Sequence, residues 1–276
     1  MNCSSDNRIA DSRDDFKIYN LNLMEELLPL QKGIIYGPVI SRRLGRSLGI
    51  NILSPFRKIC SFDCSYCQYG ATTMLTMQPP REAFPTTNEI LHEVEKALVF
   101  HKHLDYLTFS GNGEPTLHPD FSVIAEGIRS LRDRLRPEVK IALFTNSTIL
   151  SNSGVQKGIV DIDFPIYKLD AGNQEMFEKV NRPTGGIGID DIIDQLSSMR
   201  QITIQSLFLT GGMEDPEHFL FKSYLKAIQK IKPRLIQLSS CDWSIPSRGV
   251  IKLPKYKLSQ IADSIRDKYS GSIEIY

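Results

Sequence analysis

Short apolar runs alternate with amphipathic segments along most of the chain. Seven runs rich in apolar side chains predict β-strands, at residues 47–53, 104–109, 140–144, 164–169, 202–209, 235–240 and 272–275. Between several of these runs, apolar side chains recur every three or four residues and predict helices at 87–100, from 121 onward and at 216–231. Alternating strands and helices of this kind are typical of parallel β/α units that share one sheet.

The helix at 87–100 has the clearest local signals. Ile90, Val94 and Leu98 fall on one face, and Thr86 with Glu89 has the spacing of a capping box, in which each residue bonds the backbone amide of the other. The sequence therefore fixes both the buried face of this helix and its first residue.

Six strand–helix units and one terminal strand predict an α/β fold with a partial (β/α)6 barrel. An open doubly wound sheet is the rival architecture. Residues 1–14 are polar and show no sustained apolar period, and the regular alternation of strands and helices begins past residue 32. We therefore expect residues 1–32 to form an N-terminal extension and residues 33–276 the core domain with a C-terminal extension. No apolar run is long enough to cross a bilayer and no signal peptide is visible, so we expect a cytoplasmic protein that does not bind membranes.

The composition is that of one enzyme-sized domain. The chain has 276 residues, of which 41% are hydrophobic, and a net charge of +1. A protein whose main function is to bind nucleic acid is expected to be more strongly basic than this. Residues 33–62 nevertheless contain no acid and five basic residues, which are Arg42, Arg43, Arg46, Arg57 and Lys58. This basic segment is interpreted equally well as a solvated face or as a site for an anionic ligand.

Residues able to carry chemistry follow the predicted strands, where parallel folds bind their ligands. In chain order they are the cysteines after residue 53, the loop Ser110–Pro115, Asn146, Lys168 with Asp170, and Asp242. Their shared position predicts one site at the carboxyl edge of the sheet.

The most specific motif is the run of Cys60, Cys64 and Cys67, a CxxxCxxC spacing. Thiolates are soft ligands for iron–sulfur clusters or zinc, and three of them leave one iron of a four-iron cluster open to another ligand. Zinc remains an alternative, although its fourth ligand would have to come from His92, His101 or His103, which lack a paired spacing. A structural disulfide is disfavoured, because the cysteine count is odd and nothing indicates an oxidising compartment.

Gly111 and Gly113 flank Asn112 and precede Glu114. Glycines allow a positive φ and a close approach of the backbone to a ligand, and a carboxylate beside them can receive an ammonium group. An ordinary strand-to-helix turn with an acid at the helix start is the simpler interpretation of this loop alone.

Taken together, the cysteine motif and the glycine loop resemble the radical S-adenosylmethionine (SAM) superfamily. The resemblance implies a partial barrel of the radical SAM type, a [4Fe–4S] cluster on Cys60, Cys64 and Cys67, and SAM bound at the open iron. It further implies cofactor contacts from the aromatic residue before the last cysteine and from the strand ends: Tyr66, Gly113, Glu114, Lys168 and Asp170. Gly111 and Asn146 are further candidate cofactor contacts, because they lie at the same predicted edge. Asn112 departs from the family pattern, which has glycine at that position.

Within the superfamily, the stretches 36–49, 64–70 and 168–171 are similar to a group of iron–sulfur oxidoreductases related to wyosine-forming tRNA enzymes. The resemblance spans residues 33–256. Wyosine-forming enzymes carry additional cysteines for a second cluster, whereas only Cys3 and Cys241 remain here. The resemblance therefore leaves the substrate open.

The implied activity is reductive cleavage of SAM to a 5′-deoxyadenosyl radical, which abstracts a hydrogen atom from a substrate in the barrel. The implied partners are an external electron donor such as flavodoxin or ferredoxin and an unidentified substrate, with a tRNA base or a partner protein as candidates. An activase for a glycyl-radical enzyme and a non-catalytic iron–sulfur electron carrier or redox sensor are the alternatives.

The strand at 235–240 offers a substrate-side candidate. Gln237, Ser239 and Cys241 alternate on one face, and polar groups inside a barrel need partners or a ligand. Cys241 is our candidate catalytic residue, as a hydrogen-atom donor or substrate contact, against the simpler reading of a small buried hydrophobic residue.

Overall fold

The computed structural model describes residues 27–210, 215, 218–241 and 250–276. Eight strands form one sheet in the order β1-β2-β5-β6-β7-β8-β9-β10. Their bounds are β1 Ile35–Ser41, β2 Gly45–Ile50, β5 Tyr106–Phe109, β6 Lys140–Thr145, β7 Phe164–Lys168, β8 Thr203–Leu207, β9 Leu235–Ser239 and β10 Ser272–Ile275. Apart from β1, which is antiparallel to β2, every neighbouring pair is parallel.

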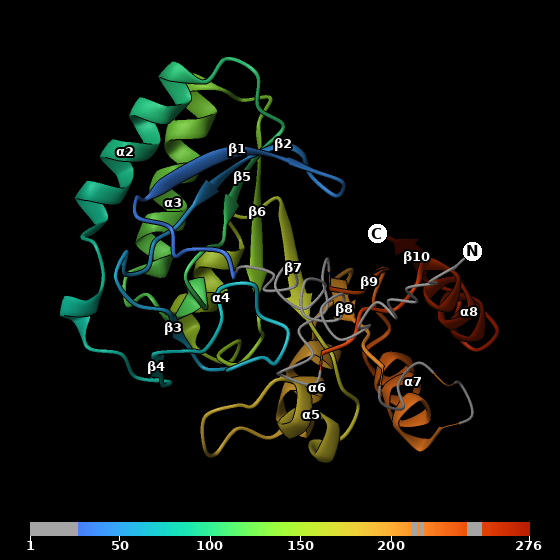
Figure 1. Ribbon diagram of the computed structural model, residues 1–276. Helices are drawn as coiled ribbons and strands as arrows, with labels where there is room; N and C mark the ends of the chain where they lie inside the picture. The colour runs from blue at the N-terminus through green and yellow to red at the C-terminus, as the bar shows by residue number, and fades with distance from the viewer. Residues whose placement is uncertain (1–26, 211–214, 216–217, 242–249) are drawn as a thin grey trace, which may run out of the picture.

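Helices cover the outer side of this curved sheet (Figure 1). They are α2 Thr87–Phe100, α3 Phe121–Leu135, α4 Ser153–Ile159, α5 Gln174–Val180, α6 Ile189–Ser198, α7 Phe219–Ile231 and α8 Lys255–Arg266. Two-residue strands β3 Ile59–Cys60 and β4 Met74–Leu75 form a separate ladder, and short 3-10 turns lie at Arg81–Ala83 and Pro115–Leu117. Among the residues that the structure describes, no helix is long and apolar enough to span a membrane.

The sheet confirms the predicted α/β fold and partial barrel. In the described residues β1 and β10 are the two edges, and no ladder pairs them, so the barrel is open. The hairpin of β1 and β2 extends toward the end of β10 (Figure 1), where the guanidinium of Arg43 lies 4.8 Å from the ring centre of Tyr276.

Most predicted elements lie within a few residues of their observed bounds. The capping box of α2 is present, with the amide of Glu89 donating to Thr86 Oγ1 at 3.3 Å and the amide of Thr86 donating to Glu89 Oε2 at 2.7 Å. The first predicted strand, 47–53, corresponds to β2, which begins at Gly45 and ends at Ile50.

Strand β1 is absent from the sequence prediction. Its sequence, Ile-Tyr-Gly-Pro-Val-Ile-Ser, breaks the alternation expected of a strand, and its register shifts between Tyr36 and Val39. Proline cannot donate to a ladder and is tolerated on an edge strand, which is where Pro38 lies. Helices α4, α5, α6 and α8 also go beyond the elements predicted from the sequence.

Residues 27–32, which the sequence analysis assigns to the extension, contact the core. The amide of Leu28 donates to the carbonyl of Gln68 at 2.8 Å, and the amide of Gln31 to Asn112 Oδ1 at 2.8 Å. The division into an extension and a core domain stays a prediction, and Cys3 lies outside the described residues.

Candidate functional site

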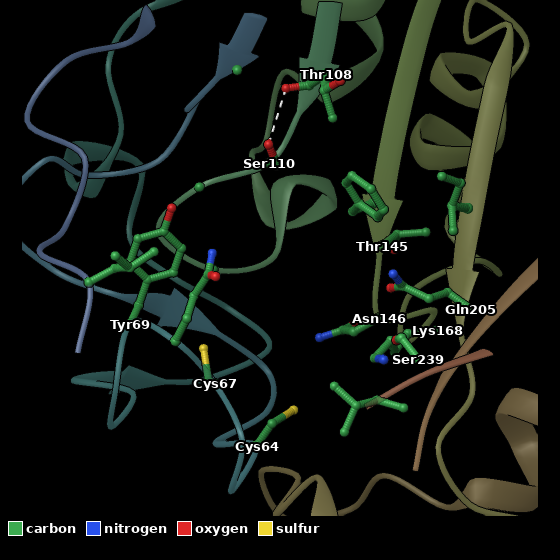
Figure 2. Close-up of a pocket in the computed structure, with 18 of the residues that line it drawn as sticks. Cys64, Cys67, Tyr69, Thr108, Ser110, Thr145, Asn146, Lys168, Gln205 and Ser239 are labelled. Atoms are coloured by element: carbon green, nitrogen blue, oxygen red, sulfur yellow. Dashed lines mark hydrogen bonds between the residues drawn. The ribbon is translucent and has the colours of Figure 1, made fainter. Parts of the chain in front are cut away.

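The three motif cysteines lie on one loop that faces a single cavity. Cys60 ends β3, and Cys64 and Cys67 follow, with the amide of Cys67 donating to the carbonyl of Cys64 at 3.1 Å. All three have free thiols and line a cavity of about 590 Å³. Figure 2 shows Cys64 and Cys67 on one side of this space, across from Lys168 and Gln205.

Side-chain amides approach two of the sulfur atoms. Nδ2 of Asn146 lies 3.6 Å from Sγ of Cys60, and Nδ2 of Asn181 lies 3.4 Å from Sγ of Cys64. Donors in these positions stabilise sulfur that carries negative charge, as it does when bound to iron.

The cysteines are buried in surroundings that disfavour a bare thiolate. Burial raises the pKa of Cys64 to about 11, and the neighbouring Asp170 carboxylate adds to this shift. Burial also raises the pKa of Cys60, with Cys64 and Glu114 contributing. A bound cation reverses this balance, because positive charge favours the deprotonated ligand.

The three cysteine thiols are the soft donors that this cavity offers to a cluster or to a single ion. In the described part of the chain, no three Cys, His, Asp or Glu side chains are gathered around one point as a single metal ion requires. A [4Fe–4S] cluster needs only one thiolate at each of several separate irons. The histidines considered as zinc ligands, His92, His101 and His103, are not among the residues that line the cavity.

The glycine loop between β5 and the following 3-10 turn packs directly against the cysteine loop. The amide of Ile59 donates to the carbonyl of Asn112 at 2.9 Å, and the amide of Glu114 donates back to the carbonyl of Ile59 at 3.0 Å. Gly113 has a φ of +138°, and a Cβ atom there would lie 1.7 Å from the carbonyl oxygen of Ile59. Gly111 has a φ of +123°, which residues other than glycine rarely adopt, and a Cβ there would lie 2.7 Å from Asn51 Oδ1. The positive φ expected of both glycines is confirmed.

Asn112, the departure from the family pattern, has a structural task. Its side chain is fully buried, and Nδ2 donates to the carbonyl of Gln31 at 2.9 Å and to that of Ser54 at 2.8 Å. It therefore fastens the segment before β1 to the glycine loop, which glycine cannot do.

Glu114 joins the ends of β5 and β6. Oε1 accepts hydrogen bonds from the amide and hydroxyl of Thr116 at 3.0 and 2.6 Å and from the hydroxyl of Thr145 at 2.9 Å, and Oε2 accepts from the amide of Asn146 at 2.6 Å. Burial raises the pKa of Glu114, and these hydrogen bonds act in the opposite direction. The carboxylate lines the cavity and Oε2 retains capacity for one further donor.

Lys168 and Asp170 form an ion pair at the end of β7. Nζ of Lys168 lies 2.9 Å from Oδ1 of Asp170 and 5.1 Å from the ring centre of Tyr66. Asp170 also accepts from the hydroxyl of Tyr66, from Asn181 Nδ2 at 2.8 Å and from the amide of Leu207 at 2.8 Å. Burial, with Asp170 beside it, raises the pKa of Tyr66.

The predicted contacts at this strand end separate into two kinds. Lys168, Tyr66 and Asn146 line the cavity, whereas Asp170 is not among the lining residues and contacts Lys168 and Tyr66. Asp242, also predicted at this edge, lies outside the described residues.

The wall opposite the cysteines comes from β8 and β9 and from the segment after β9. Gln205, Ser239, Ser240 and Cys241 line it, and Figure 2 shows Gln205 and Ser239 on this side. Cys241 is buried and packs with Leu209 and Val250. Both the hydrophobic role and the chemical role considered for Cys241 are compatible with this position.

Several residues of the site escaped the sequence analysis. Tyr36, Tyr69 and Gln205 line the cavity, and Asn181 contacts Cys64 from the end of α5. Inward alternation along residues 202–209 could have indicated Gln205, but no spacing rule brings Asn181 to the cysteine loop.

Comparison with known proteins agrees with this geometry. The Radical SAM superfamily model matches residues 54–220. The chain is 31% identical to a UPF0026 protein of Methanocaldococcus jannaschii, covering 82% of this chain and 68% of that protein, and 32% identical to one of Synechocystis, covering 74% of each. It is also 31% identical to a Brachyspira hyodysenteriae protein named GTPase Obg, over 74% of this chain but only 29% of that protein.

Two solved structures share the fold. One is a radical SAM methyltransferase from Sphaerobacter thermophilus, with a TM-score of 0.59 and 12% identity over 83% of this chain and 65% of that chain. The other is TYW1 with a lysine-pyruvate adduct bound, with a TM-score of 0.56 and 14% identity over 82% and 74% of the two chains. At these identities the likeness is one of fold.

Proposed function

Because the chain belongs to the radical SAM superfamily and to the UPF0026 family, we propose that Cys60, Cys64 and Cys67 hold its cluster while a substrate binds inside the barrel. Members of the superfamily use a [4Fe–4S] cluster and SAM, and these are the cofactors of this chain. When bound, they supply a 5′-deoxyadenosyl radical that abstracts a hydrogen atom from the substrate.

One observation carries the proposal: three free thiols, the glycine loop and Glu114 line the same cavity. The glycine loop lets the backbone approach a ligand beside the cysteines. Glu114 presents a buried carboxylate that would receive the ammonium group of SAM, and the four hydrogen bonds it accepts fix its orientation.

Other residues would prepare the site without contacting the reacting atoms. Asn146 and Asn181 would stabilise negative sulfur through their Nδ2 donors. Tyr66, held by Asp170, would offer its ring and backbone to the nucleoside, with Lys168 beside it. Burial of this wall keeps water away from a reactive intermediate.

Radical SAM enzymes need an electron source, and we propose an external one-electron donor such as flavodoxin or ferredoxin. A tRNA base and a glycyl-radical partner protein remain hypotheses for the substrate.

The test is anaerobic reconstitution followed by reduction in the presence of SAM. We expect about four irons per chain and formation of 5′-deoxyadenosine and methionine, because one cubane accounts for the three thiolates. Cys64→Ala should lose both iron and product, whereas Cys241→Ala should keep its iron.

Two results would redirect the assignment. Tightly bound zinc in protein purified without oxygen would overturn the cluster. A reduced protein that binds SAM but never yields 5′-deoxyadenosine would instead favour the electron carrier or redox sensor.

A further inference from the structure

Asn181 lies between the cysteine loop and the end of β7. Its side chain is buried, and its Nδ2 atom has three neighbours that are able to accept a hydrogen bond. They are Sγ of Cys64 at 3.4 Å, Oη of Tyr66 at 3.4 Å and Oδ2 of Asp170 at 2.8 Å. Asn181 therefore contacts both a motif cysteine and the carboxylate of the Lys168–Asp170 ion pair.

Asp170 is surrounded by donors on both of its oxygens. Oδ1 accepts from the amide of Leu207 at 2.8 Å and lies 2.9 Å from Nζ of Lys168, and Oδ2 accepts from the hydroxyl of Tyr66 and from Asn181. A backbone amide and a lysine ammonium can only donate, so they meet Asp170 as a carboxylate, which can only accept. Its side chain is fully buried and does not line the cavity, so its effect on the site passes through these neighbours.

This carboxylate determines which end of the Asn181 amide faces the cysteine loop. If the two ends were exchanged, the amide oxygen would lie against the Asp170 oxygen, and two acceptors in contact repel each other. The hydroxyl proton of Tyr66 is directed at Asp170, so the Tyr66 oxygen also acts as an acceptor toward Asn181. Nitrogen is therefore favoured at this position, and its second N–H remains for Tyr66 and for the sulfur of Cys64.

Main-chain hydrogen bonds hold the helix end beside Cys64. The amides of Asp63 and Ser65, on either side of Cys64, donate to the carbonyl of Asn181 at 3.1 Å and to that of Val180 at 2.8 Å. Asn181 is also the C-cap of α5. None of these bonds uses the Asn181 side chain, so a substitution there keeps the loop and the helix together.

A donor next to a cluster thiolate favours the reduced state. Reduction adds negative charge, part of which lies on sulfur, and hydrogen bonds to the sulfur atoms are among the features that set the potential of such clusters. An amide oxygen in the same place would have the opposite effect. The orientation of one amide therefore affects how readily a cluster on Cys64 accepts an electron.

We propose, resting on the proposed function above, that Asp170 is a positioning residue that turns the nitrogen of Asn181 toward Cys64, and that this contact raises the reduction potential of the cluster. The cluster takes up one electron from the external donor, and the Asn181 N–H stabilises the added charge. Asp170 acts through Asn181 rather than by contact with SAM.

The experiment is a redox titration of the reconstituted protein without SAM, with dithionite as reductant, in which the reduced cluster is followed by electron paramagnetic resonance. Asn181→Leu keeps the approximate shape of the side chain and removes the donor. We expect the ratio of reduced to oxidised cluster at a fixed potential to fall about threefold to tenfold, which for one electron is a midpoint lower by about 30–60 mV. Iron should stay at about four per chain.

Asn173→Ala is the matched control, because it removes an asparagine side chain from the other end of α5. Asn173 does not line the cavity, and its side chain caps the helix by accepting from the amide of Met176 at 2.9 Å. Losing this cap should lower the melting temperature and leave the midpoint potential unchanged.

Asp170→Asn tests the positioning step. An amide at position 170 can donate as well as accept, so it no longer selects the nitrogen of Asn181. In this background, Asn181→Leu should shift the midpoint by less than about half of its effect in the wild type, as coupled residues do in a double-mutant cycle. An equal shift in both backgrounds would overturn the role of Asp170.

The inference is wrong if Asn181→Leu leaves the midpoint unchanged, or if Asn173→Ala moves it as much. Asn181→Ala is titrated in parallel, as a smaller substitution, and loss of iron from both Asn181 variants would assign this side chain to cluster assembly instead. Wild-type protein that forms no cluster or no 5′-deoxyadenosine would contradict the proposed function. An active cluster whose potential is insensitive to Asn181 would contradict this inference alone.

Discussion

Glu114 connects two strand ends at the wall of the cavity. It is buried and accepts hydrogen bonds from Thr116, Thr145 and Asn146, so one side chain sets the distance between the glycine loop and the segment after β6. Asn146 in turn reaches Cys60 through its Nδ2 atom. The position of the amide near the sulfur therefore depends on Glu114.

We expect Glu114→Ala to weaken SAM binding while leaving iron content nearly unchanged, because no cysteine is altered. The free energy of unfolding should fall by about 1–3 kcal/mol, since the amides of Thr116 and Asn146 lose a buried acceptor. Calorimetric titration with SAM, iron analysis and urea denaturation measure the three quantities. Loss of iron with retained SAM affinity would contradict this assignment.

At the level of elements, His118 connects the segment before α2 to the start of α3. Its Nε2 lies 3.1 Å from the carbonyl of Pro85, and its Nδ1 accepts from the amide of Asp120 at 3.0 Å. Burial lowers the pKa of His118 below 6.5; Arg81 acts in the same direction, whereas the Pro85 carbonyl and Asp120 oppose it. The neutral ring is the form that satisfies both contacts, because protonated Nδ1 cannot accept.

This predicts a stability that falls in mild acid. The unfolded chain takes up a proton near pH 6.5 while the folded chain resists, so His118 contributes full stability above that pH and loses it as the pH falls toward the lower folded pKa. The urea midpoint of the wild type should therefore drop between about pH 7.5 and about pH 5.5. His118→Gln should show a smaller drop, whereas His92→Gln, an exposed change on α2, should behave like wild type. Equal pH dependence in all three proteins would exclude His118 as the cause.

At the scale of the whole molecule, the open barrel has two free edges that approach each other. No ladder joins β1 to β10 in the described residues, yet Arg43 of the β1–β2 turn stacks on Tyr276 after β10. A cation–π contact at a partly exposed site stabilises by about 0.5–1 kcal/mol. This energy is small, but the contact connects the β1–β2 turn to the residue after β10.

Tyr276→Leu should loosen this connection. We expect faster hydrogen exchange of the amides in the β1–β2 turn and in β10, with little change in β5 to β7. Tyr276→Phe is the matched control, since it keeps the ring face and loses only the hydroxyl that bonds Glu274. Unchanged exchange in Tyr276→Leu would show that the β1–β2 turn is held by other contacts.

The sequence alone determined the elements whose signals are local. The capping box at Thr86 and Glu89 marked the start of α2, the alternation of apolar runs gave the parallel strands, and the close spacing of the cysteines indicated a cluster. The positive φ of Gly111 and Gly113 was also predictable from the sequence. This signal is local too, because glycine has no Cβ and adopts a positive φ without steric cost.

Only the tertiary structure decided which polar groups meet. Asn181 reaches Cys64 across 117 positions of the chain, and Glu114 reaches Asn146 across 32. It also separated Lys168, which lines the cavity, from Asp170, which does not, and Arg43, facing the cavity, from exposed Arg46. The pattern of a strand specifies which residues share a face, but the curvature of the sheet and the order of its strands determine what that face encloses.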